Sequence, residues 1–185
     1  MSSIAELITA ASTEHARESE FAALERALRA SPGAGRAALD ADVEGTSWVV
    51  WRAHPAHTHQ AWLAMISAML ATGSDTCLNL VLHKLEVDLW PDRIDGEFFD
   101  LLLAQGLQHR VLEMVSNGIA GIIDSYYEGI ERGKTDPWGN FEPPEITAGI
   151  VGDILAQLPI GLQAAARFAV RSHSGEIANI IDQVG

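Results

Sequence analysis

Residues 95–132 read DGEFFDLLLAQGLQHRVLEMVSNGIAGIIDSYYEGIER, and this stretch decides the fold class. At about 100° per residue its polar side chains fall in one narrow stripe, and nearly every other position is apolar. The stripe consists of His109, Glu113, Asn117, Asp124, Glu128 and Glu131. A helix with so narrow a polar face is packed on most of its circumference, which predicts one long central helix over 95–132.

Two glycines, Gly118 and Gly121, lie in the middle of this predicted helix. Small residues three apart either let another backbone approach closely or mark a kink, and the sequence leaves both alternatives open. A similar pair occurs in GIVGDIL at 149–155, but no fixed period recurs, so the chain is not a repeat array.

Helical signals also dominate the N-terminal part of the chain. Ser3 and Glu6 form a capping box ahead of an apolar repeat, and residues 3–30 are predicted to be helical. A polar stretch in the middle with fresh capping residues leaves open whether this is one helix or two. Ser31-Pro32-Gly33 is predicted to end it.

Two further helices are predicted in the middle of the chain. The apolar run at 60–72 is a buried helix that Gly73 ends, and Ser74 or Asp75 can cap a helix over 77–90. A hairpin turning at His83-Lys84 is the alternative for this second run, but it lacks the Gly or Asn that a tight turn favours.

The C-terminal third begins with a loop at 133–145 that is rich in Gly and Pro. Pro143-Pro144 is predicted to open the next helix, since a proline in the first turn loses no hydrogen bond. Another segment begins after Pro159, and Ser174 can cap a last short helix.

Residues 45–52, GTSWVVWR, form the one segment of β type, because β-branched residues and Trp suit a pleated surface. No partner strand is evident. We therefore expect a short extended segment near residues 46–52 that serves as a sheet edge, a connector or a pairing surface for another chain.

Together these signals predict an all-α protein, a single-domain helical bundle of about seven helices over residues 1–185. Residues 1–44 form a more polar N-terminal helical arm, and residues 45–185 form the apolar helical core.

Charge and composition limit the partners of the chain. It has 185 residues, 48% of them hydrophobic, and a net charge of −13 from 12 basic and 25 acidic residues. Such a surface repels nucleic acids and anionic membranes, whereas it attracts a basic protein partner. The alternative is that the negative charge only keeps the protein soluble.

The single cysteine, Cys77, cannot form an internal disulfide and lies in an apolar stretch. The N-terminal residues lack the basic and apolar regions of a secretory leader, and no apolar run reaches about 18 residues. A cytoplasmic protein is therefore expected.

Three histidines, His54, His57 and His59, lie within six residues of one another. Neutral imidazole binds divalent transition metals such as zinc, and an extended backbone would place His57 and His59 on one side. If a helix began at Pro55, they would instead point about 200° apart. The alternative is that they only lead into the helix at Gln60.

The sequence offers less support for other candidate metal-binding or catalytic residues. His109 and Glu113 are four apart and could share a ligand, but they also belong to the polar stripe. The acidic residues in 88–100 do not match the calcium-loop spacing, and the chain has no nucleophile elbow, phosphate-binding loop or dinucleotide fingerprint. No catalytic residue and no cofactor-binding residue can be named.

The sequence thus favours a non-catalytic protein-binding or regulatory module, which binds a basic partner or itself through Trp48, Trp51 and Trp138. The alternative is a small metal-dependent enzyme or metal-binding protein centred on the three histidines.

Overall fold

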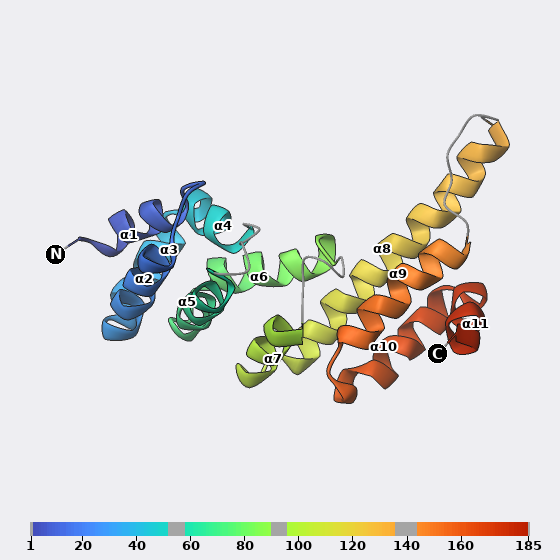
Figure 1. Cartoon of the computed structure of the whole chain (residues 1–185). Helices are drawn as coiled ribbons and strands as arrows, with labels where there is room; N and C mark the ends of the chain where they lie inside the picture. The colour runs from blue at the N-terminus through green and yellow to red at the C-terminus, as the bar shows by residue number, and fades with distance from the viewer. Residues whose placement is uncertain (1, 52–57, 90–95, 136–143, 185) are drawn as a thin grey trace. The chain divides into compact units, whose positions relative to one another are not determined.

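The computed structural model describes residues 2–51, 58–89, 96–135 and 144–184. Over these ranges the chain forms eleven helices and no strand, which confirms the all-α prediction (Figure 1). The number exceeds the expected seven for three reasons. The run over 3–30, left open as one helix or two, forms two helices, the run predicted as one helix over 95–132 is divided, and two helices were not foreseen. The chain divides into two compact units, Met1–Lys84 and Leu85–Gly185, each with its own buried side chains.

The first unit holds five complete helices and most of a sixth. They are α1 (Ile4–Ala11), α2 (Glu18–Ala30), α3 (Pro32–Ala41), α4 (Val43–Trp51), α5 (His59–Ala71) and the start of α6 (Asp75–Val87). α2 and α5 pack along each other. α1 packs on α2, α3 packs on both α2 and α5, and α1 and α3 also contact α4. The core between α2 and α5 consists of Phe21, Leu24, Leu28, Met65, Ile66 and Met69, all fully buried.

The N-terminal helix begins where the sequence predicts. Ser3 Oγ accepts a hydrogen bond from Glu6 N, and Glu6 Oε2 accepts one from Ser3 N. Residues 3–30 form two helices, since α1 ends at Ala11 and α2 begins at Glu18. The capping box therefore fixes one end of a short helix of eight residues.

The expected extended segment near residues 46–52 is wrong where it is described, because Val43–Trp51 is the helix α4. Asp42 Oδ1 accepts a hydrogen bond from Gly45 N at 2.9 Å, which caps the first turn. Val49 and Val50 are fully buried on the inner face. Burial of this face outweighs the β preference of valine, which reflects packing more than backbone geometry.

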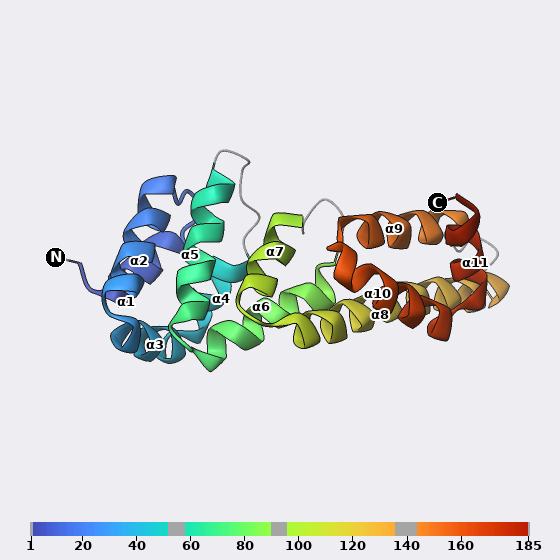
Figure 2. The ribbon, with the colours of Figure 1, turned by 90° about the horizontal axis from the view of Figure 1, so that it is seen from below.

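The second unit is built around α8 (Gln108–Thr135). α7 (Gly96–Ala104) packs near its start, and α9 (Pro144–Gln157) and α10 (Ile160–His173) lie along it (Figure 2). α11 (Gly175–Val184) packs on α9 and α10. The predicted starts at Pro144 and after Pro159 are confirmed, and Ser174 Oγ accepts a hydrogen bond from Ile177 N, as a cap of α11 requires.

The long helix predicted over 95–132 is divided at Gly106, which has a φ of +75°. Leu107 N donates to Leu102 O, and Gly106 N donates to Leu103 O, so α7 ends in a Schellman motif. Only glycine adopts this left-handed conformation without a steric penalty. The six polar residues of the predicted stripe are all exposed along α8, so its solvated face is confirmed.

No helix within the described ranges is both long and apolar enough to cross a membrane.

Candidate interaction surface

The surface singled out by the tryptophans is the outward face of α4. Its inner face is fixed by two hydrogen bonds to neighbouring helices. Thr46 Oγ1 donates to Leu39 O at 3.1 Å, and Trp62 Nε1 of α5 donates to Val49 O at 2.9 Å. Because these contacts set the rotation of α4, they also determine which residues face outward.

Three residues, Glu44, Trp48 and Trp51, share the outward face, since they are spaced four and then three apart. Trp48 leaves 61% of its surface exposed, Glu44 is exposed, and Trp51 is half-buried. The face therefore presents one large aromatic side chain with a carboxylate one turn before it.

The half-buried Trp51 is held by two residues of α6. The ring of His83 meets it edge-on, with centroids 5.4 Å apart and planes at 64°. Lys84 Nζ lies 5.5 Å from the centroid of the indole, and Lys84 is only 3% exposed. An ammonium over an aromatic face is attracted by the ring quadrupole, so Trp51 helps to offset the desolvation of this charge.

The histidine cluster is described only at His59, because His54 and His57 lie outside the described residues, as does Trp138. His59 is the first residue of α5, after Thr58 at the N-cap, and it stacks on Trp62 with centroids 6.0 Å apart. His59 therefore contacts Trp62, the residue whose indole N–H donates to Val49 O of α4. No group of three His, Cys, Asp or Glu side chains among the described residues is arranged to hold a metal.

The second histidine candidate belongs to the solvated face of α8. His109 and Glu113 are both exposed, and Glu113 Oε2 lies 3.9 Å from Arg110 Nε. An exposed ion pair of this kind contributes at most about 1 kcal/mol and needs no functional explanation.

Cys77 is fully buried, and the loss of hydration raises the pKa of its thiol to about 12. A thiol with so high a pKa is protonated at neutral pH, so it cannot act as a nucleophile there. Cys77, which the sequence places in an apolar stretch, is therefore a small residue of the core.

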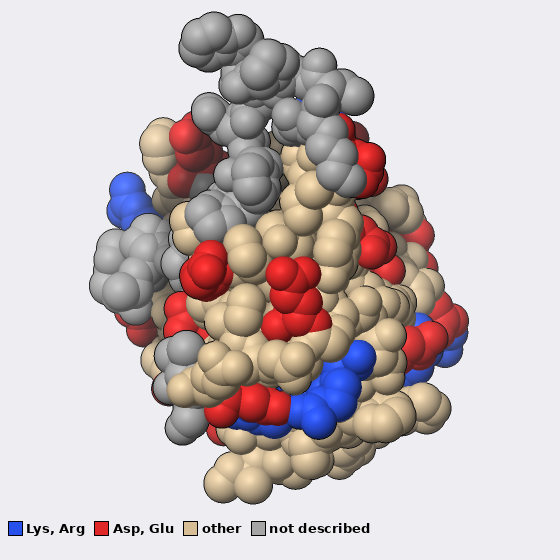
Figure 3. All heavy atoms as spheres, turned by 90° about the vertical axis from the view of Figure 1, so that its right-hand side faces the viewer, with Lys and Arg blue, Asp and Glu red and all other residues tan. Residues whose placement is uncertain are grey.

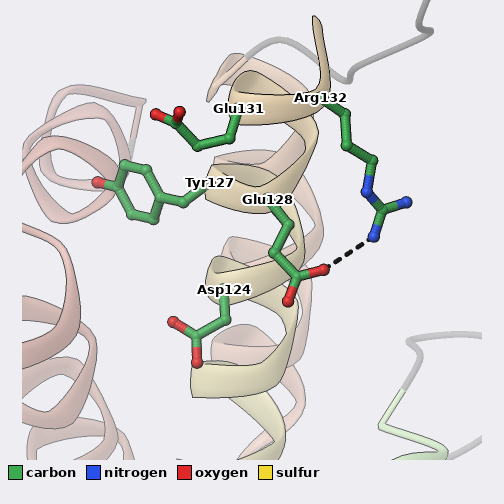
Figure 4. Close-up of a pocket in the computed structure, with 5 residues that line it drawn as sticks. All are labelled: Asp124, Tyr127, Glu128, Glu131 and Arg132. Atoms are coloured by element: carbon green, nitrogen blue, oxygen red, sulfur yellow. Dashed lines mark hydrogen bonds and ion pairs between the residues drawn. The ribbon is translucent and has the colours of Figure 1, made fainter. Parts of the chain in front are cut away.

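An open depression of about 540 Å³ lies on α8 (Figure 4). Its described lining consists of Asp124, Tyr127, Glu128, Glu131 and Arg132. Arg132 Nη2 lies 2.9 Å from Glu128 Oε2, which leaves the local charge negative. The three carboxylates of this lining belong to the polar stripe predicted from the sequence. The position of Tyr127 in the lining could not be predicted, because it depends on which elements pack beside α8.

On the face shown in Figure 3, charged side chains are dispersed. On the face shown in Figure 3, red acidic side chains are scattered among uncharged ones, and the blue group near the lower edge lies beside acidic side chains. The net charge of −13 therefore does not gather into one acidic patch on this face.

Two apolar residues of α10 that were not predicted as candidates, Ile160 and Phe168, are 87% and 74% exposed. The spacing of residues along α10 indicates that these two side chains are exposed. The buried stripe of α10 consists of Leu162, Ala166 and Val170, and both residues project from the opposite side of the helix.

No family model matches the chain, and neither does any curated protein or solved structure. What the protein does must therefore be inferred from its own side chains.

Proposed function

We propose that this chain is a non-catalytic protein-binding module that holds a basic protein partner at the outward face of α4. The observation that carries the proposal is the 61% exposure of Trp48 on a helix whose opposite face is fixed by hydrogen bonds. Tryptophan is enriched among the residues that dominate binding energy, because it buries a large area with few rotatable bonds.

Charge supports a basic partner over an acidic one. The chain carries −13, and Glu44 lies one turn from Trp48 on the same face. A partner that places Lys or Arg against Glu44 and an apolar side chain against Trp48 matches both features. The long-range attraction would raise the association rate and would weaken as salt is added.

Trp51 and Trp138 extend the proposed surface. Trp51 adds its exposed edge and is held in place by His83 and Lys84. Trp138 lies in the segment after α8 and is a predicted contact only.

The test is quantitative affinity purification with the wild-type chain, Trp48→Ala and Val43→Ala as bait. Val43 is a matched control, because it is a 53% exposed apolar residue of the same helix on a different side. We expect at least one basic protein whose recovery falls about tenfold or more with Trp48→Ala, as for a binding hot spot, and is unchanged with Val43→Ala. Recovery that is equal for all three baits would refute the proposal.

A second candidate function is metal binding by His54, His57 and His59. It rests on the spacing of the three histidines in the sequence. In the structure α5 begins at His59, and Thr58 before it has helical dihedral angles, so the backbone at Thr58 is not the extended one that would place His57 and His59 on one side. Elemental analysis of untagged protein tests it. About one zinc or similar ion per chain would support the candidate, and substoichiometric metal in chelator-free buffer would exclude it.

A further inference from the structure

The outward face of α10 presents large apolar side chains at regular spacing. Ile160, Ala164 and Phe168 follow one another every four residues, and all three are exposed. Residues of this spacing form one ridge along a helix, with its two large members separated by a small one. Exposed apolar side chains that are aligned and this large mark an interaction site more often than scattered ones do.

The charges beside this ridge are already paired. Residues 160–173 contain no Asp or Glu, and Arg167 and Arg171 border the ridge. Both guanidinium groups form ion pairs with Asp182 of α11, at 3.9 Å for Arg167 and closer for Arg171. Since the arginines have a carboxylate partner within the chain, the ridge does not require an acidic partner to neutralise it.

We propose that the outward face of α10 is a homodimer interface, at which a second copy of this chain packs in antiparallel orientation about a two-fold axis through Ala164. The interface shares no residue with the Trp48 surface and does not depend on the proposed function.

The spacing makes the ridge complementary to itself. A two-fold axis at Ala164 places Phe168 of one copy opposite Ile160 of the other, because each lies four residues from the centre. The small side chain of Ala164 lets the two helices approach closely where they cross. Arg167 falls opposite Gly161, where a Cβ atom would meet no described atom within 4 Å. The ridges are of the i±4 type, which pack at a crossing angle of about 50°.

Charge favours a second copy at this face over the rest of the surface. The chain carries −13, so two copies repel each other where their acidic side chains meet. α10 contributes no acid to its outward face, and its two arginines lie at the border. A contact centred on Ala164 therefore brings apolar side chains together. It does not place the acidic side chains of one copy opposite those of the other.

The first test is sedimentation equilibrium of the full chain. Because the contact is small, we expect reversible dimerisation with a dissociation constant of about 10–100 µM. Phe168→Ala and Ile160→Ala should each weaken it about tenfold or more, since the symmetry removes the side chain twice. The matched control is Ile146→Ala, which alters a 49% exposed isoleucine on α9 and should leave dimerisation unchanged.

The second test is disulfide cross-linking of Ala164→Cys with diamide as the oxidant. Cys77 is fully buried and should not react with the oxidant, so only the introduced thiol can form the disulfide. Two cysteines on the two-fold axis should give a covalent dimer, whereas Ala156→Cys, an exposed alanine of α9, should not.

Several results would overturn the proposal. These are a monomer at every concentration, dimerisation that persists in both alanine variants, and equal cross-linking at positions 156 and 164. A monomer would indicate that the face is covered within the chain or by a different protein. Trp48→Ala should leave the dimer intact, so the two proposals fail separately.

Discussion

Gly118 of α8 lies directly against the backbone of Glu86 at the end of α6. A Cβ atom on Gly118 would sit 2.9 Å from the carbonyl oxygen of Glu86 and 3.3 Å from that of Leu85. Beside it, Asn117 Nδ2 lies 3.4 Å from Glu86 Oε1. Of the two roles that the sequence left open for this glycine, close approach of another backbone is therefore confirmed.

Gly118→Ala should destabilise the second unit by about 1–3 kcal/mol, because a backbone carbonyl cannot move aside as a flexible side chain can. Gly121 is the matched control, since a Cβ there would meet no described atom within 4 Å. Gly121→Ala should be neutral or stabilise by about 0.5–1 kcal/mol through helix propensity. Urea unfolding followed by circular dichroism measures both, and equal effects of the two variants would contradict the packing.

A polar network connects the end of α3 to the start of α6. Ser74 Oγ donates to Asp40 Oδ1 at 2.6 Å and accepts from Cys77 N at 3.1 Å, so it is the cap of α6. Thr76 N donates to the same carboxylate oxygen. Ser74→Ala should cost about 1–2 kcal/mol, since it removes the cap and leaves Cys77 N without an acceptor. Thermal unfolding against Ser67→Ala, a half-buried serine of α5, is the measurement.

The same network predicts a pH dependence. The hydrogen bond from Ser74 lowers the pKa of Asp40, with help from Thr76 and Arg36. A carboxyl group whose pKa is lower in the folded state contributes stability above its unfolded pKa, and this is lost as the pH falls through the folded value. Asp40→Asn should therefore lose less stability than the wild type between neutral pH and about pH 3. Parallel acid titrations of the two proteins measure this difference, and a variant that loses as much stability as the wild type would contradict the prediction.

Cys77 gives a prediction at the opposite end of the pH scale. Burial raises the pKa of its thiol to about 12, against 9.0 for an ordinary thiol. The unfolded chain then releases the proton first, so stability should fall as the pH rises above 9. Cys77→Ala should flatten this fall while lowering stability at pH 7. In native protein the thiol should resist alkylation until the chain unfolds, and rapid labelling at pH 7.5 would be inconsistent with its burial.

Much of the helical pattern follows from the sequence, because caps and terminating glycines act locally. Ser3, Ser74 and Ser174 each accept the backbone hydrogen bond expected of an N-cap. Gly73 ends α5 with a φ of +72°, as predicted. The run over 77–90, for which a hairpin was the alternative, is helical from its start through Val87, because α6 spans Asp75–Val87.

The missed elements depend on contacts that no local pattern contains. α3 begins at Pro32, which was predicted only to end the preceding helix, and it includes Gly35. A Cβ at Gly35 would lie 2.8 Å from Leu28 Cδ2 of α2, so packing selects a residue that disfavours helix. The helix α4 likewise depends on a buried face. Trp48 is exposed, and its role as a contact residue stays a prediction. The exposure of Ile160 and Phe168 follows only from what packs on the other side of α10.

Tyr127 and Ser174 connect the acidic depression of α8 to the start of α11. Their hydroxyl oxygens are 2.8 Å apart, and Ser174 also accepts from Ile177 N at 3.2 Å. Ser174→Ala should cost more stability than Tyr127→Phe, because it removes the cap of α11 as well as the bond to the tyrosine. The two changes should couple by about 0.5–1.5 kcal/mol in a double-mutant cycle, the range for a neutral hydrogen bond. If Tyr127→Phe costs as much in the Ser174→Ala background as in the wild type, the phenol is held by its ring alone and the bond contributes nothing.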